Sequence, residues 1–136
     1  METRVLKTIE RHDKGYNCAQ AVACTYCDLV GIDEETMFRI TEGFGAGMGN
    51  MEGTCGAVSG ACALAGLKRS TGNLSAPDSK GKTYQLSKAI LKAFKEQNST
   101  VVCKELKGVG TGKVLRPCAD CIMDAARIAE KILFEE

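Results

Sequence analysis

Apolar residues recur at intervals of three and four positions along most of the chain, the spacing that places them on one face of an α-helix. The C-terminal segment has the clearest pattern, with apolar positions at Ile122, Ala125, Ala126, Ala129, Ile132 and Leu133. Further helices are predicted over residues 5–15, 19–30, 33–41, 55–67 and 86–94, and Asp33 is the predicted N-cap of the helix at 33–41. No run of alternating apolar and polar residues indicates a β-strand. We therefore predict an all-α fold, a bundle of about five or six helices in a single domain over residues 1–136.

Glycine interrupts the helical pattern most densely between residues 43 and 53. The glycines there are Gly43, Gly45, Gly47, Gly49 and Gly53. Glycine destabilises regular structure and permits unusual backbone angles, so this segment is predicted to be a glycine-rich loop. Such a loop can approach the side chains that it covers closely, or it can be a plain flexible connector. Residues 70–82 and 107–113 are polar and contain glycine, and they are predicted to be loops as well.

Cysteine is the residue type that changes this picture, because the chain contains eight of them. The N-terminus lacks the apolar run of an export signal, so we expect a cytoplasmic protein. The reducing cytosol disfavours a framework of structural disulfides. Free cysteine can also pack as a small apolar side chain, which explains one or two cysteines better than it explains eight. The sequence therefore predicts that thiols carry the function.

Charge and hydropathy exclude two classes of partner. The 18 basic and 17 acidic residues nearly cancel and are scattered along the chain, so no basic stripe is available to bind nucleic acid. The longest weakly polar stretch, residues 57–67, is much shorter than the ~20 residues of a membrane-spanning helix. We expect neither nucleic acid nor a membrane as a partner. A redox partner protein is expected, and a homo-oligomer is compatible with the sequence.

Four of the cysteines are predicted at the starts of helices, namely Cys18, Cys55, Cys103 and Cys118. Asn17 and Thr54 are suitable N-caps for the first two. Thr100 can cap a short helix around the third, and Pro117 suits the first turn just before the fourth. The free N–H groups and the positive dipole end at a helix start lower the pKa of a thiol from ~8.5 toward neutrality. Because the thiolate both attacks disulfides and binds metals, these four are the candidate catalytic, cofactor-binding and metal-ligating residues.

The remaining cysteines have weaker signals. Cys24 and Cys27 form a CxxC pair within an apolar helical pattern, where packing in the core is the expected role. Cys62 lies seven residues after Cys55, about 20° away around a helix, and is either its neighbour or a core residue. Cys121 forms a second CxxC pair with Cys118, and its role is left open.

Three segments resemble the C_GCAxxG_C_C family of redox-active proteins. They are Asn17-Cys18-Ala19-Gln20-Ala21-Val22, Gly43-Phe44-Gly45-Ala46-Gly47-Met48-Gly49 and Thr54-Cys55-Gly56-Ala57-Val58-Ser59-Gly60-Ala61. The four cysteines of the family signature map here onto Cys18, Cys55, Cys103 and Cys118. The family name has Gly-Cys-Ala where this chain has Cys55-Gly56-Ala57. The family is also similar to the cluster-bearing region of split-Soret cytochromes, which implies that the four thiolates can hold an iron–sulfur centre.

The expected function is therefore redox chemistry at four clustered cysteines. Either an iron–sulfur cluster transfers electrons there, or the thiols cycle between dithiol and disulfide with no cofactor. The alternative is a structural zinc-binding protein or a small interaction module, in which thiolates only hold the fold together. Haem is not implied, because the chain contains no CxxCH motif.

Overall fold

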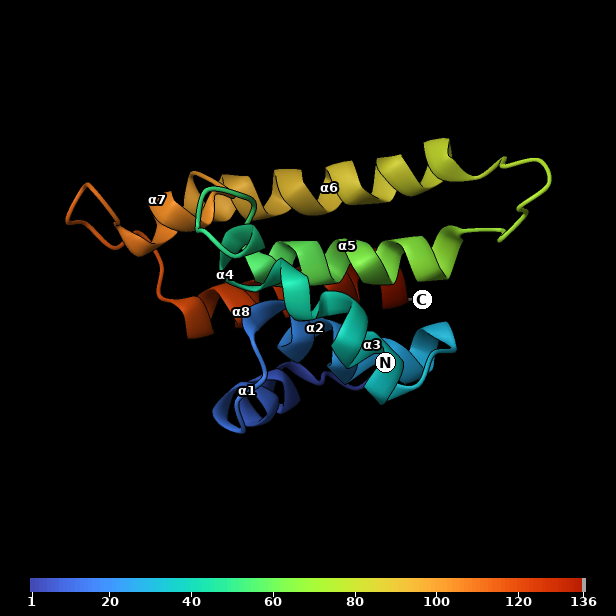
Figure 1. Ribbon diagram of the computed structural model, residues 1–136, viewed down its shortest axis with the longest axis horizontal. Helices are drawn as coiled ribbons and strands as arrows, with labels where there is room; N and C mark the ends of the chain where they lie inside the picture. The colour runs from blue at the N-terminus through green and yellow to red at the C-terminus, as the bar shows by residue number, and fades with distance from the viewer. Residues whose placement is uncertain (136) are drawn as a thin grey trace.

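The computed structural model describes residues 1–135, and their regular structure is helical (Figure 1). The longer helices are α1 (Val5–Asp13), α2 (Cys18–Tyr26), α3 (Glu34–Thr41), α5 (Gly56–Arg69), α6 (Lys80–Asn98) and α8 (Cys118–Ala129). The shorter segments are η1 (Cys27–Val30), η2 (Glu42–Phe44), α4 (Gly45–Met48), α7 (Cys103–Lys107) and η3 (Glu130–Phe134). The predicted all-α fold is confirmed. Between residues 1 and 135, no helix has both the length and the apolarity needed to cross a bilayer.

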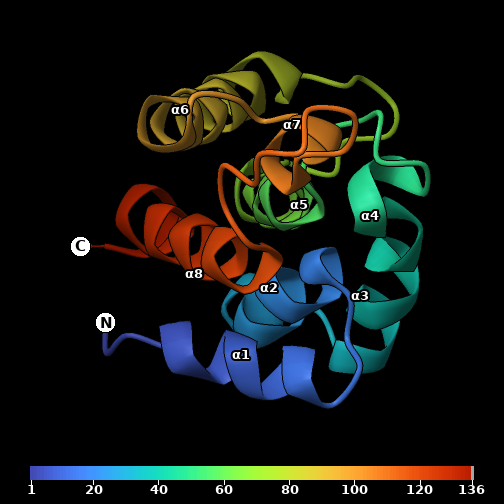
Figure 2. The same cartoon turned by 90° about the vertical axis from the view of Figure 1, so that its left-hand side faces the viewer.

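Helix α5 lies at the centre of the bundle (Figures 1 and 2). It packs against α6 on one side and against α2 and α8 on the other, while α1 contacts α2 and α8 and α3 contacts α2. The core between these helices contains the fully buried side chains of Tyr26, Leu64, Ile90, Phe94 and Ile122. Burying one such side chain stabilises the fold by roughly 1.5–3 kcal/mol. The apolar helix faces that the sequence indicates thus converge on α5.

Gly60 allows α5 to lie close against α2. A Cβ atom at this position would lie 2.6 Å from the carbonyl oxygen of Ala19, which belongs to the backbone of α2. Only glycine permits this approach without a shift of one helix. The close packing brings the start of α5, at Cys55, near the start of α2, at Cys18.

Two of the predicted N-caps are confirmed. The Asn17 side chain accepts a hydrogen bond from the N–H of Gln20, whose own side chain accepts one from the N–H of Asn17, so the two residues form a capping box. Asp33 caps α3 by accepting a hydrogen bond from the N–H of Thr36. Both local patterns therefore place the beginnings of their helices correctly.

The other predicted N-caps are wrong by one or two residues. Cys55 itself, instead of Thr54, occupies the N-cap of α5, and Val102, instead of Thr100, occupies the N-cap of α7. The physical reason is an antiparallel β-bridge between Thr54 and Val102, the one bridge in the described part of the chain, which holds both residues outside the helices. Pro117 is the N-cap of α8, one residue before the first turn in which it was expected.

The glycine-rich segment is not an irregular loop throughout. The short segments η2 and α4 occupy residues 42–48. Within α4, Ala46 (φ 52°, ψ 44°) and Gly47 (φ 56°, ψ 55°) have left-handed backbone angles, yet the N–H of Gly49 still donates to the carbonyl of Gly45 at 2.9 Å. The predicted glycine-rich loop is therefore not confirmed, and Ala46 and Gly47 form a tight turn with left-handed backbone angles.

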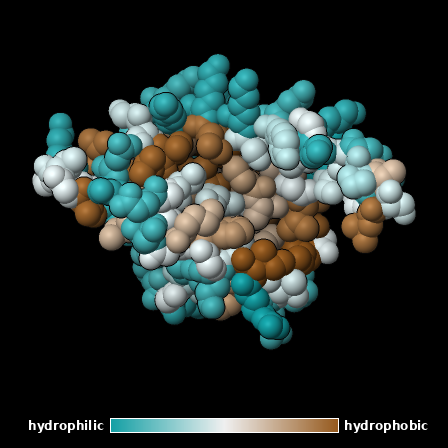
Figure 3. All heavy atoms as spheres, turned by 45° about the horizontal axis from the view of Figure 1, so that its top comes forward, coloured by the Kyte–Doolittle hydropathy of each residue, from teal (hydrophilic) through white to brown (hydrophobic). Residues whose placement is uncertain are grey.

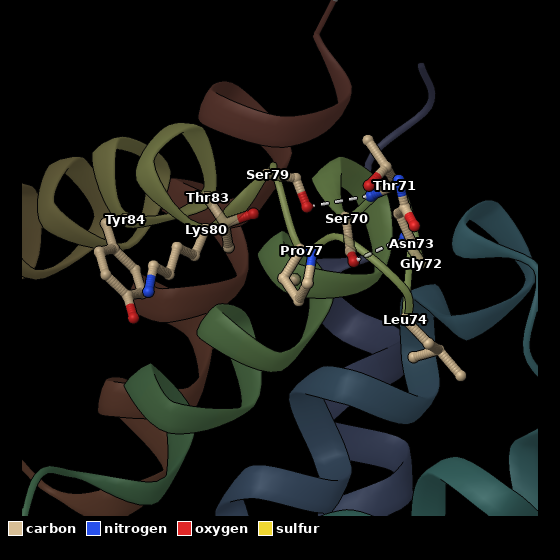
Figure 4. Close-up of a pocket in the computed structure, with 11 residues that line it drawn as sticks. Ser70, Thr71, Gly72, Asn73, Leu74, Pro77, Ser79, Lys80, Thr83 and Tyr84 are labelled. Carbon is tan, nitrogen blue, oxygen red and sulfur yellow. Dashed lines mark hydrogen bonds between the residues drawn. The ribbon is translucent and has the colours of Figure 1, made fainter.

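The connector between α5 and α6, residues 70–79, lies at the opposite end of the molecule from α7 (Figure 1). The N–H of Thr71 donates to the hydroxyl of Ser79 at 3.1 Å, so the connector folds back on itself (Figure 4). Leu74 of the connector and Tyr84 of α6 both line a pocket of about 340 Å³. Helix α6 begins at Lys80, within the predicted loop 70–82.

Candidate functional site

Five cysteines occupy the end of the bundle that faces the viewer in Figure 2, where α5, α7 and α8 begin. They are Cys18, Cys55, Cys103, Cys118 and Cys121. All four cysteines that the sequence singles out belong to this group. The pKa of each is shifted by the charge of another cysteine of the group or by a hydrogen bond with one. Cys121 is the additional member. We call this group the cysteine site.

The first contact within the cysteine site joins Cys18 to Cys118. Cys18 is the first residue of α2 and only 7% exposed, whereas Cys118 is the first residue of α8 and is partly exposed. The thiol of Cys118 donates a hydrogen bond to the sulfur of Cys18. This bond lowers the pKa of Cys18 to about 6 and raises the pKa of Cys118, which retains the proton. The pair therefore consists of a thiolate and a thiol at neutral pH.

Further groups stabilise the negative charge on Cys18. Burial alone would raise the pKa of this thiol, but the backbone N–H groups of Ala46 and Ala19 lower it. The positive charge of Lys107 acts in the same direction. Ala46 has the left-handed backbone conformation described above, which is costly for a residue with a side chain. The strained turn thus supplies an N–H group to the sulfur.

Two glycines allow the backbone to approach the sulfurs of the cysteine site closely. A Cβ atom on Gly56 would collide with the sulfur of Cys18. A Cβ atom on Gly47 would lie 2.5 Å from the Cβ of Cys103 and 3.4 Å from its sulfur. These close approaches give the glycines of this region a specific structural role.

The second contact joins Cys55 to Cys121. Cys55 is held at the N-cap of α5, where its own N–H donates to the carbonyl of Val101 at 2.6 Å. The thiol of Cys121 donates to the carbonyl of Arg116 at 3.7 Å and also interacts with the sulfur of Cys55. The interaction with Cys55 lowers the pKa of Cys55 and raises the pKa of Cys121. The N–H groups of Ala57 and Val58 lower the pKa of Cys55 further. The site therefore contains two cysteine pairs, and in each pair one sulfur has a lowered pKa and the other a raised pKa.

Cys103 belongs to neither pair. It is the first residue of α7, only 4% exposed, and its N–H donates to the carbonyl of Gly53 at 3.0 Å. Burial raises the pKa of its thiol, although the charge of Lys107 partly offsets this effect. Cys103 is close enough to Cys18 and Cys55 for their charges to raise its pKa as well. A position at a helix start is therefore not sufficient to make this thiol acidic.

Cys121 is the member of the site to which the sequence assigned no role. It lies three residues after Cys118, so both sulfurs project from the same side of α8. The CxxC spacing is thus the signal that could have placed Cys121 at the site. Its partner Cys55 is distant in the sequence, and only the packing of α5 against α8 brings the two together.

The other three cysteines lie elsewhere. Burial raises the pKa of Cys24 to about 12, and its thiol is directed at the carbonyl of Glu34. Cys27 donates to the carbonyl of Cys24 at 3.3 Å, and burial raises its pKa too. Cys62 is half-buried in α5 and also has a raised pKa. These thiols remain protonated and unreactive at neutral pH.

The arrangement of the sulfurs does not match a metal centre. Thiolates are good ligands for zinc and for iron–sulfur clusters. Among residues 1–135, however, no group of three or more His, Cys, Asp or Glu side chains is disposed to hold a metal ion. The sulfurs form two pairs, with Cys103 beside them. The donors are chemically suitable for zinc or for a cluster.

An apolar groove of about 850 Å³ is lined by residues of α3, η2, α4 and α5. Met37 of α3, Phe44 of η2, Met48 of α4 and Leu67 of α5 contribute to its walls. Figure 3 shows apolar residues across the middle of the molecular surface, bordered by hydrophilic ones. The groove and the cysteine site therefore share the turn formed by η2 and α4.

Comparison with known proteins gives one match. The model of a family described as "Putative redox-active protein (C_GCAxxG_C_C)" matches residues 16–132, which include all five cysteines of the site. No curated protein and no solved structure matches the chain.

Proposed function

Since the chain belongs to the C_GCAxxG_C_C family of redox-active proteins, we propose that Cys18 and Cys118 cycle between a thiolate–thiol pair and a disulfide. The observation that carries this proposal is the hydrogen bond from the Cys118 thiol to the Cys18 sulfur. It places the two reacting atoms in contact and keeps one of them ionised. The thiolate is the nucleophilic form in thiol–disulfide exchange.

The proposed reaction transfers two electrons. When the Cys18–Cys118 bond forms, the thiolate and the thiol together lose two electrons and one proton. A disulfide on the redox partner accepts both electrons, and with that proton and one from solvent it leaves as two thiols. The partly exposed Cys118 is the member of the pair that a partner can reach most directly.

Counting thiols tests the proposal. Protein purified anaerobically and reduced is oxidised with glutathione disulfide, and its thiols are counted after unfolding. Wild type should lose thiols reversibly, and Cys18→Ser and Cys118→Ser should each abolish the Cys18–Cys118 disulfide. Cys62→Ser, which changes a cysteine outside the site, should retain it. The absence of a reversible Cys18–Cys118 disulfide in wild type would refute the proposal.

Elemental analysis of the same preparation tests the metal alternatives. Stoichiometric iron with visible absorbance would replace disulfide cycling by electron transfer through an iron–sulfur centre. Tightly held zinc, with no change on oxidation, would indicate a structural metal site. A colourless, metal-free protein that forms the disulfide is the outcome we expect.

A further inference from the structure

The pair of Cys55 and Cys121 is not required by a reaction at Cys18 and Cys118. Cys121 is only 2% exposed and Cys55 only 5%, so both sulfurs lie beneath the surface. Helices α5 and α8 pack against each other, and this packing places the Cys121 thiol in hydrogen-bond contact with Cys55. The Cys121 thiol also donates to the carbonyl of Arg116 at 3.7 Å, so its sulfur contacts both this carbonyl and the sulfur of Cys55.

We propose that Cys55 and Cys121 form a second disulfide, so that the fully oxidised protein carries two disulfides and holds four electrons fewer than the reduced protein. This inference rests on the proposed function of the Cys18–Cys118 pair. It assigns a redox role to Cys121, and it divides the cysteine site into an outer pair, Cys18 and Cys118, and an inner pair, Cys55 and Cys121.

The inner pair exchanges electrons through the outer pair, because an external disulfide cannot reach its buried sulfurs. Cys55 is close enough to Cys18 and Cys118 for their charges to influence one another. The Cys55 thiolate attacks the Cys118 sulfur of the outer disulfide. The Cys55–Cys118 bond forms, the Cys18–Cys118 bond breaks, and its electron pair leaves on Cys18 as a thiolate.

Cys121 completes the exchange. It attacks the Cys55 sulfur, the Cys55–Cys121 bond forms, and Cys118 leaves with the electron pair and takes up the proton that Cys121 loses. The products are the inner disulfide and the original thiolate–thiol pair at Cys18 and Cys118. No external reactant is consumed in this step, and a second partner disulfide can then oxidise the outer pair again.

Peptide mapping can identify each disulfide separately. Trypsin with an endoproteinase that cleaves before aspartate cuts between Ala119 and Asp120, which places Cys118 on peptide 114–119 and Cys121 on peptide 120–123. Cys55 falls on peptide 40–68. Cys18 shares peptide 15–27 with Cys24 and Cys27, so fragmentation of the linked peptide by mass spectrometry identifies which of the three is bonded. The Cys62→Ser variant serves as the starting protein, because Cys62 would otherwise share the Cys55 peptide.

Oxidation of Cys62→Ser should remove four thiols and link peptide 40–68 to 120–123 as well as 15–27 to 114–119. Adding Cys121→Ser should limit the loss to two thiols, with Cys118 bonded to Cys18 or trapped on Cys55. If only the 15–27 to 114–119 link forms, the inner disulfide is refuted while the proposed function stands. If neither link forms, the proposed function itself fails. A link from Cys55 to the Cys103 peptide 96–104 would also overturn the inference.

Discussion

The acidity of Cys18 has a non-local origin. Its position at the start of α2 supplies the N–H group of Ala19, but the largest effect on its pKa is the hydrogen bond from Cys118, a residue on a different helix. The turn at Ala46 adds a further N–H group. Together these groups overcome the burial that raises the pKa of most other cysteines in this chain.

Cys118→Ala should therefore raise the pKa of Cys18 from about 6, because it removes the largest cause of the lowered value. Only the thiolate reacts, so alkylation of Cys18 at neutral pH should slow by about tenfold. The measurement is the pH dependence of Cys18 modification by iodoacetamide, followed by mass spectrometry. If the loss of the Cys118 side chain also exposes the Cys18 sulfur, the maximal rate of alkylation would rise, but the midpoint of its pH dependence would not change. An unchanged midpoint would show that Cys118 does not control this thiol.

The matched control is Cys24→Ala, which removes a buried cysteine outside the site. It should leave the midpoint of Cys18 where it is in wild type. The thiol of Cys24 should itself remain unmodified in the folded wild-type protein at neutral pH, because burial raises its pKa to about 12.

Among the helices, α5 shows most clearly how position decides the effect of a glycine. Gly60 faces α2 at close range, whereas nothing lies within 4 Å of a Cβ atom built on Gly66. The two residues are in the same helix and six positions apart. Replacing each by alanine therefore separates two effects: the steric cost of an added Cβ between two helices, and the difference in helix propensity between glycine and alanine.

Gly60→Ala should destabilise the protein by about 1–3 kcal/mol, because the added methyl group must push α5 away from the backbone of α2. Gly66→Ala should instead stabilise it by up to about 1 kcal/mol, since alanine favours a helix more than glycine does. Urea unfolding followed by circular dichroism measures both. A loss of stability in Gly66→Ala as large as that in Gly60→Ala would contradict this explanation.

The sequence predicts the elements well where the signal is local. Periodic apolar residues locate the helices, and the side chains of Asn17 and Asp33 mark two of their starts because an N-cap bonds to an N–H group two or three residues later. The predicted start of α5 is wrong because Thr54 pairs in a β-bridge with Val102, which lies far along the chain. The predicted glycine-rich loop is not confirmed, and the close approach of Gly47 to Cys103 is a contact that no local pattern indicates.

At the scale of the whole molecule, Asp124 connects segments that position the cysteine site. Its buried carboxylate accepts hydrogen bonds from Arg116 at 3.0 and 3.1 Å, and from Asn98 at the end of α6 at 3.3 Å. Arg127 also donates to it at 3.3 Å. The segment that leads into Cys118 is thereby fixed against α8.

Asp124→Ala should lower the free energy of unfolding by about 2–3 kcal/mol, because Arg116 and Asn98 lose the buried carboxylate that accepts their hydrogen bonds. Glu52→Gln is the matched control, since it breaks the exposed ion pair with Lys104 (3.5 Å) and should change stability by less than ~1 kcal/mol. Urea unfolding compares the two. Equal effects would mean that the network around Asp124 contributes no more than a surface charge pair.

The composition of the cysteine site is predictable from the sequence only in part. Helix starts and the family resemblance single out four of its five cysteines. The pairing of Cys18 with Cys118, and of Cys55 with Cys121, depends on how helices distant in the sequence pack, which no local pattern encodes. For the same reason, Cys103 and Cys118 lie at helix starts and yet have raised pKa values.

The contact between Cys18 and Cys118 also links redox state to folding. A bond between these residues would close a loop of about 100 residues and, through the entropy of the unfolded chain, favour the folded state by about 4–5 kcal/mol. In a thermodynamic cycle, the same free energy makes the disulfide harder to reduce in the folded protein than in the unfolded one. The hydrogen bonds to the Cys18 thiolate oppose this effect, because they stabilise the reduced fold. The difference in conformational stability between the oxidised and reduced protein therefore equals, in free energy, the shift in reduction potential that folding imposes on this pair.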